Sequence, residues 1–148
     1  MIVVGDRSDA LVRTTVQLAE EYELDTACCH DVYSAVAELA DVEVGAAMVI
    51  GQFDELKREN EALFALVGRS RTACCCLLDA ESIADRKAIL YAVRVGVRLM
   101  GEVSEVRECL ERWLATDRCG VGNEGLDIAD CRATEAELEA LLGQETDG

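Results

Sequence analysis

The chain has 148 residues and a formal net charge of −16, from 30 acidic and 14 basic side chains. Nucleic acids and anionic membranes bind positive surfaces, so this charge argues against both as direct partners. No apolar run approaches the ~20 residues that span a bilayer, and the start, MIVVGDRSD, lacks the basic and apolar regions of a signal peptide. We therefore expect a soluble, cytoplasmic protein without membrane contacts.

Apolar runs alternate with amphipathic stretches five times. The runs are rich in Val, Ile, Leu, Ala and Cys and end in small or polar residues, which is typical of buried parallel strands. In chain order, the predicted strands are residues 2–4, 26–29, 46–54, 72–78 and 97–100. Apolar side chains at helical spacing follow them at about residues 8–22, 32–42, 56–68, 82–95 and 104–115. This (βα)5 order predicts an α/β fold with a doubly wound, flavodoxin-like sheet of five parallel strands.

Hydroxyl residues are predicted to start the last two of these helices. Ser82 with Asp85 three residues later resembles a capping box, in which the serine hydroxyl accepts a backbone N–H of the first helical turn. Ser104 is the corresponding candidate for the final helix.

The composition changes after Cys119, which predicts a domain of residues 1–119 followed by a linker and an acidic tail, residues 120–148. Residues 120–125, GVGNEG, are typical of a flexible linker. Beyond them Leu138, Leu141 and Leu142 form the apolar stripe of a two-turn amphipathic helix. So short a helix is marginal alone. We expect it either to dock on a surface or to remain a solvated acidic terminus.

The first 118 residues or so resemble the receiver domains of two-component response regulators in element order, element length and strand-end sequence. In that family, an acidic pair follows the first strand and an Asp that ends the third accepts a phosphoryl group. A Ser or Thr ends the fourth strand, and a Lys ends the fifth. These residue types suit the chemistry, which needs a carboxylate nucleophile, oxygen ligands for Mg²⁺ and a cation for the phosphoryl oxygens.

This chain departs from the receiver pattern at most of those positions. Gly5 and Asp6 stand at the acidic pair, Gln52 at the phosphoacceptor, Asp79 at the hydroxyl and Gly101 at the lysine. An amide is a poor nucleophile and a neutral metal ligand, and Asp79 adds negative charge where phosphate would arrive. The resemblance therefore implies a pseudo-receiver that is not an enzyme. Asp6 and Asp79 either cap the helices that follow or retain a cation site.

Eight cysteines raise the question of a metal or redox centre. Cys28, Cys29 and the run 74–76 lie in predicted strands, where cysteine serves as a small core hydrophobe. In the receiver strand order 2-1-3-4-5 the second and fourth strands are about 14 Å apart, far beyond a ~2.3 Å zinc–sulfur bond. We expect no metal, no cofactor and slow thiol chemistry at these residues, with Cys119 and Cys131 reacting first. The single histidine, His30, is expected to have no special role.

The predicted function is a non-catalytic, phosphorylation-independent regulatory or scaffold module that acts by protein–protein contact. Residues 82–100 contain four basic residues, Arg86, Lys87, Arg94 and Arg98, against one acid. In receivers, the matching region and the helix after it form the usual partner and dimer face, so we expect a protein partner, or a homodimer, there. The alternative is small-ligand (nucleotide, flavin or metal) sensing or catalysis in the crevice around Asp6, Gln52 and Asp79, although no Gly-x-Gly-x-x-Gly is present.

Overall fold

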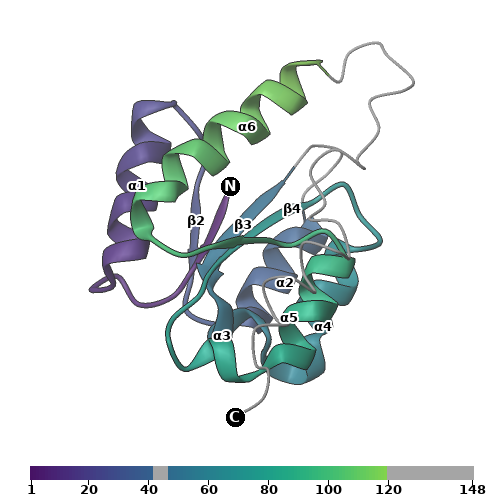
Figure 1. The fold of residues 1–148 in the computed structure, drawn as a ribbon. Coiled ribbons are helices and arrows are strands. Elements are labelled where there is room, and N and C mark those ends of the chain that lie inside the picture. The colour runs from purple at the N-terminus through teal and green to yellow at the C-terminus, as the bar shows by residue number, and fades with distance from the viewer. Residues whose placement is uncertain (42–46, 120–148) are drawn as a thin grey trace.

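The computed structural model describes residues 1–41 and 47–119, and within them five parallel strands form one sheet (Figure 1). The strands are β1 (Ile2–Val4), β2 (Ala27–Cys29), β3 (Met48–Gln52), β4 (Ala73–Leu77) and β5 (Arg98–Met100). Their order is β2-β1-β3-β4-β5. This is the flavodoxin-like order, distinct from the Rossmann order 3-2-1-4-5-6. The predicted α/β fold class is confirmed.

Helices cover both faces of the sheet (Figure 1). One face carries α1 (Ala10–Glu21) and α6 (Val106–Cys119), and the other carries α2 (Val32–Asp41), α4 (Arg58–Val67) and α5 (Arg86–Arg94). A four-residue helix, α3 (Phe53–Leu56), precedes α4. The 3₁₀ turns η1 (Ser82–Ala84) and η2 (Val103–Glu105) precede α5 and α6.

The cysteines of β4 divide between the two faces because successive residues of a strand point to opposite sides. Cys74 and Cys76 pack in the cluster with α2, α4 and α5, whereas Cys75 packs in the cluster with α1 and α6 against Cys109. All four thiols are buried and free. The interpretation of residues 74–76 as small core hydrophobes is confirmed.

Cys28 is exposed, so its predicted place in the core is wrong. It lies on β2, an edge strand of the sheet. Its neighbour Cys29 points to the other face and is buried in the cluster with α2. On the side of Cys28, α1 packs against β1 and β3, with α6 beside it. Helix α1 therefore covers the centre of the sheet and leaves the flank of the edge strand open.

The two predicted helix starts are also wrong. Ser82 is buried in η1, and the N-cap of α5 is Asp85, whose Oδ1 accepts a hydrogen bond from Ala88 N at 3.1 Å. Ser104 lies in η2 and donates to Glu102 at 3.0 Å. In both cases the hydroxyl donates to a nearby carboxylate, and a 3₁₀ turn comes before the α-helix.

The predictions for the linker and tail concern residues 120–148, which lie outside the described residues. This holds for the docking leucines Leu138, Leu141 and Leu142 and for Cys131. In the described ranges, no helix has both the length and the apolar character required to cross a bilayer.

Candidate functional site

The sheet brings the strand-end positions singled out in the sequence to one edge. In the parallel register Val4 pairs with Gly51, and Gln52 pairs with Leu77, which in turn pairs with Met100. Gly5 and Gly101 directly follow Val4 and Met100 at the carboxyl ends of their strands, and Asp79 lies two residues after Leu77. Ligand sites of open α/β sheets lie at this edge.

Gln52 joins the end of β3 to the start of α1. Its Nε2 donates to Asp9 Oδ2 at 3.2 Å, while Asp9 Oδ1 caps α1 by accepting from Leu11 N at 2.8 Å. The amide at the phosphoacceptor position thus already has an internal partner. Its neighbour Gly51 allows close packing, since a Cβ there would lie 3.1 Å from the Leu56 side chain and from Val4 O.

Asp6 and Asp79 each close a local turn. One oxygen of Asp6 accepts from Ser8 N and Ser8 Oγ, both at 2.7 Å, and one oxygen of Asp79 accepts from Ser82 N and Ser82 Oγ, also at 2.7 Å. These hydrogen bonds hold the pKa of both carboxyls below the ordinary value. The prediction that these two acids cap the helices that follow is wrong: Asp9 is the N-cap of α1 and Asp85 is the N-cap of α5, so Asp6 and Asp79 only close the turns that come before. Over residues 1–41 and 47–119, no group of three His, Cys, Asp or Glu residues is placed to hold a metal.

A polar network joins the ends of β3 and β4, and we call it the Lys57 network: Asp54, Lys57, Asp79, Ser82 and Asp85. Lys57 Nζ lies 2.6 Å from Asp54 Oδ1 and 3.3 Å from Asp85 Oδ2. Ser82 Oγ lies 3.0 Å from Asp54 Oδ2 and 2.7 Å from Asp79 Oδ1. The ammonium group therefore occupies the space between a carboxylate of α3 and the carboxylate that caps α5.

The electrostatics of the network follow from these contacts. The hydrogen bond to Asp54 raises the pKa of Lys57, and Asp85 adds to this. The Ala88 N–H, and then Lys57, lower the pKa of Asp85. The sequence singled out Asp79, Ser82 and Asp85 for other roles, but Lys57 and its contacts with Asp54 and Asp85 were not predicted. The signal available was the i, i+3 spacing of Asp54 and Lys57 at a helix start, which favours an ion pair.

The predicted interaction face lies on α5 and β5. Arg86, Lys87 and Arg94 are exposed on α5, and Ile83, in the turn before it, is 57% exposed. Arg98 differs, because it is half-buried on β5 and its guanidinium lies 3.4 Å from Glu108 of α6. The exposed positive charge of this face therefore comes from α5.

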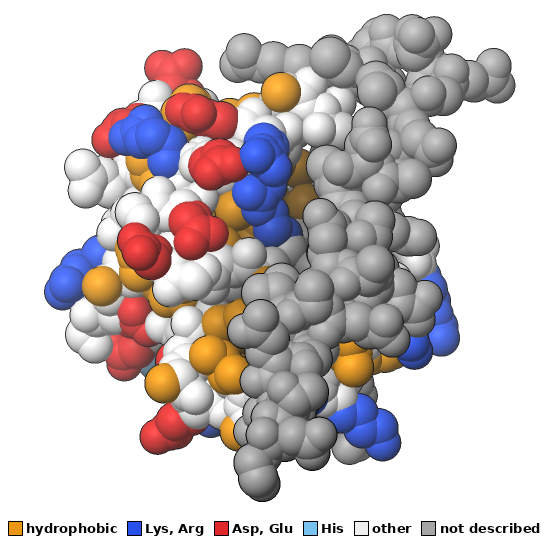
Figure 2. All heavy atoms as spheres, viewed as in Figure 1, with side chains coloured by type: hydrophobic (Ala, Val, Ile, Leu, Met, Phe, Trp, Pro, Cys, Tyr) orange, Lys and Arg blue, Asp and Glu red, His pale blue; other side chains and the backbone are white. Residues whose placement is uncertain are grey.

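The opposite face of the sheet has mixed charge. In Figure 2, acidic, basic and apolar side chains are interspersed over α1 and α6. Arg107 of α6 reaches Glu21 of α1 at 2.8 Å, and Arg112 pairs with Glu108 along α6 at 2.6 Å. The Arg107–Glu21 pair connects the two helices, whereas the Arg112–Glu108 pair lies within α6; both pairs are exposed, so each contributes little to stability.

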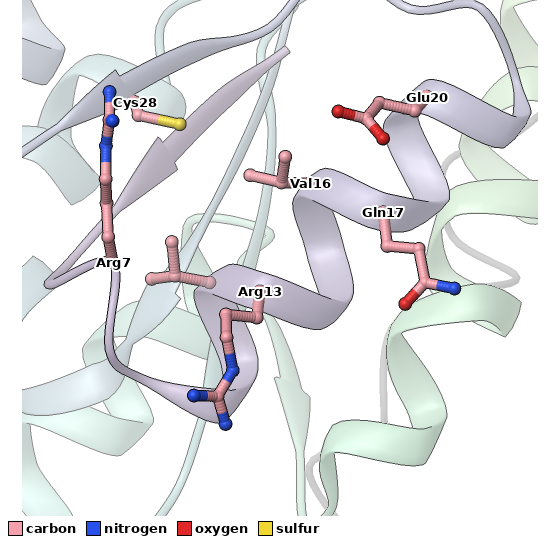
Figure 3. A pocket seen from close by; sticks show the side chains of 7 residues that line it. Arg7, Arg13, Val16, Gln17, Glu20 and Cys28 are labelled. Carbon is pink, nitrogen blue, oxygen red and sulfur yellow. The ribbon is translucent and has the colours of Figure 1, made fainter.

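Two adjacent hollows flank the edge strand β2. The first, of about 450 Å³, lies between β2 and α1 (Figure 3) and is lined by Arg7, Val12, Arg13, Val16, Gln17, Glu20 and Cys28. The second, of about 340 Å³, lies at the ends of β1 and β2 and is lined by Gly5, Asp6, Arg7, Cys28, Cys29 and His30. Arg7 and Cys28 line both hollows, and neither is lined by Gln52 or Asp79.

In comparisons with known proteins, no family model, no curated protein and no solved structure matches this chain. The resemblance to receiver domains therefore stays a prediction from the sequence.

Proposed function

We propose that the chain is a non-catalytic regulatory or scaffold module that acts by protein–protein contact and does not depend on phosphorylation. The Lys57 network is the observation that carries this proposal. At the ends of β3 and β4, the groups that could hold a cation or a phosphoryl group already bind one another. Gln52, at the position of the phosphoacceptor, is bound to Asp9.

The charge balance of the network supports the same conclusion. A phosphoryl-transfer site needs carboxylates that are open to a metal ion and a cation that is open to phosphate. Here the Lys57 ammonium pairs with both Asp54 and Asp85, and Ser82 is buried between Asp54 and Asp79. A divalent cation would have to displace Lys57, and an incoming phosphoryl group would meet three carboxylates.

The α5 surface is the proposed contact face. Ile83 supplies an exposed apolar side chain directly before α5, Arg86 and Lys87 supply positive charge at the start of the helix, and Arg94 supplies it at the end. An apolar anchor within a polar rim is the usual anatomy of a protein interface. In a chain of net charge −16, such a basic face would favour an acidic partner surface.

The test is affinity enrichment from the source cells with three baits: the native chain, Ile83→Asp with Lys87→Glu, and the control Arg69→Glu with Arg71→Glu. The control residues are exposed and lie in the turn before β4, near the C-terminal end of α5 and away from Ile83 and Lys87 at its start. We expect a partner that the native and control baits retain and that the Ile83→Asp, Lys87→Glu bait loses. We also expect the intact mass of the native chain to stay unchanged after treatment with acetyl phosphate and Mg²⁺. A stoichiometric phosphoryl adduct, or a partner set that all three baits share, would contradict the proposal.

Small-ligand sensing is the second candidate function, and the hollow at the ends of β1 and β2 is the observation that favours it. Its volume of about 340 Å³ falls within the range of ligand pockets, roughly 300–1,000 Å³. It contains Asp6 but not Gln52 or Asp79, so it lies on one side of the predicted crevice. A ligand that binds only the folded chain would raise the melting temperature in a screen of nucleotides, flavins and metal ions.

A further inference from the structure

The open flank of β2 combines a thiol, a cation and an anion around one hollow. Cys28 is exposed, whereas Cys29, Cys74, Cys75, Cys76 and Cys109 are buried. Figure 3 shows the sulfur of Cys28 directed into the space between β2 and α1. The guanidinium of Arg7 ends beside Cys28 on the strand side, and Glu20 extends from α1 on the far side. The sulfur thus lies between opposite charges.

Both charged groups are available to a ligand. Within residues 1–41 and 47–119, neither the Arg7 side chain nor the Glu20 side chain has an ion pair or a hydrogen bond. Five other cations, Lys57, Arg58, Arg98, Arg107 and Arg112, bind carboxylates. Two unpaired opposite charges facing one hollow suit a ligand that carries both signs itself.

The walls of the hollow supply the remaining contact surface. Val12 is buried and Val16 is half-buried, and both lie on the side of α1 that faces the hollow. Figure 3 shows Val16 between Cys28 and the body of the helix, while Arg13 and Gln17 point away from the sulfur. A volume of about 450 Å³ accommodates a substituent of tripeptide size over this apolar floor.

We propose that this hollow binds an amphoteric low-molecular-weight disulfide, of the amino-acid or short-peptide class, and that Cys28 forms a mixed disulfide with it. Arg7 binds a carboxylate of the ligand, for which a guanidinium is well suited. Glu20 binds its ammonium group. The two contacts place the disulfide bond over the Cys28 sulfur.

The reaction is a thiol–disulfide exchange. The thiolate of Cys28 attacks one sulfur of the ligand, a new S–S bond forms to Cys28, and the original S–S bond breaks. The second half of the ligand leaves as a thiolate and takes up the proton that Cys28 lost. Cys28 is oxidised and the leaving half is reduced, so the ligand is the only oxidant required.

The experiment uses the full, reduced chain and four disulfides: glutathione disulfide (amphoteric), dithiodipropionate (anionic), cystamine (cationic) and hydroxyethyl disulfide (neutral). Quenching with N-ethylmaleimide and peptide mapping give the rate at Cys28 itself. The variants are Arg7→Gln and Glu20→Gln, with Arg71→Gln and Glu81→Gln as matched controls. All four residues are exposed, so we expect native melting temperatures throughout.

We expect Arg7→Gln to lower the rate at which Cys28 reacts with glutathione disulfide and with dithiodipropionate by about two- to fivefold, which is the effect that an exposed charge pair allows. The rate with cystamine should not fall. Glu20→Gln should slow glutathione disulfide and cystamine but not dithiodipropionate. The control variants should react with every reagent at rates within about 1.5-fold of the native chain, because distant charges are screened. All variants should react with the neutral reagent at rates within the same limit. Rates that are insensitive to Arg7 and Glu20, or a Cys28 no faster than Cys29, would overturn the proposal. These results leave the proposed protein contact at α5 untouched, since α5 covers the other face of the sheet.

Discussion

Gly51 is predicted to be required for the packing of α3 against the sheet, and Gly51→Ala tests this. A Cβ at this position would lie 3.1 Å from two carbons of Leu56 and from the carbonyl oxygen of Val4. Favourable carbon contacts lie at about 3.5–4.0 Å. Leu56 is fully buried, and Val4 is held in β1 by its pairing with β3. Neither neighbour can move away without disturbing the core.

The magnitude follows from two opposing effects. Overpacking a core costs about 1–3 kcal/mol, and replacing glycine offsets about 0.4–1 kcal/mol through the unfolded chain. We expect the free energy of unfolding to fall by about 1–2 kcal/mol, measured by urea denaturation. For a domain of this size the melting temperature should fall by roughly 2–8 °C.

Gly101→Ala is the control, because Gly101 directly follows β5 at the edge of the sheet where Gly51 lies near the end of β3. Its added Cβ would lie 3.5 Å from Glu105 Oε1, an ordinary contact with the end of a flexible side chain. We expect no loss of stability there. In a Leu56→Val background, Gly51→Ala should cost at least ~0.5 kcal/mol less, because part of the obstructing side chain is gone. Equal effects of the two glycine substitutions, or no coupling to Leu56, would refute the packing argument.

Three further predictions concern the strand ends. Acetyl phosphate and Mg²⁺ should leave the intact mass of Gln52→Asp unchanged, because the second acid and the lysine of a receiver site are also missing; a stable adduct would contradict this. The hydrogen bonds from Ser82 lower the pKa of Asp79 in the folded chain below its ordinary value of 3.8. The stability that these bonds add is therefore fully present above pH 3.8 and is lost as the pH falls through the lower pKa of the folded chain. Ser82→Ala should raise the Asp79 pKa in an NMR titration, and an unchanged midpoint would show that the contact is unimportant. Lys57→Met should speed amide exchange in residues 82–90 by about fivefold, the equivalent of ~1 kcal/mol for a partly exposed pair, whereas Arg58→Met should not, because its partner Glu55 lies in the same short segment.

The fold was predictable because its signals are local. Each strand is a short apolar run that ends in small or polar residues, and each helix has one apolar face, so the sequence alone indicates five βα units. Once the strands are parallel, their carboxyl ends must meet at one edge. The positions of Gly5, Gln52, Asp79 and Gly101 follow from that rule without knowledge of any side-chain contact.

The details that the sequence missed depend on distant parts of the chain. Lys57 and Asp85 are far apart in sequence, and their contact exists only because α3 and η1 are adjacent at the ends of neighbouring strands. The exposure of Cys28 depends on where α1 lies across the sheet, which no pattern within β2 reveals. Ser82 matches the sequence pattern of a helix cap, but its hydroxyl hydrogen-bonds to Asp79 and Asp54. Asp85 caps α5 instead.

Asp85 links the strand ends to the proposed contact face. One of its oxygens accepts from Ala88 N and starts α5, while the other faces Lys57, which Asp54 holds at the end of β3. The start of α5, with Arg86 and Lys87, is therefore fixed to the end of β3 by a chain of charged contacts internal to the protein. A face held in this way keeps one arrangement without phosphorylation at the position of Gln52. Under the proposed function, this constant arrangement lets the module bind its partner independently of phosphorylation, and control of the protein would have to act elsewhere, such as at the open flank of β2 on the other face of the sheet.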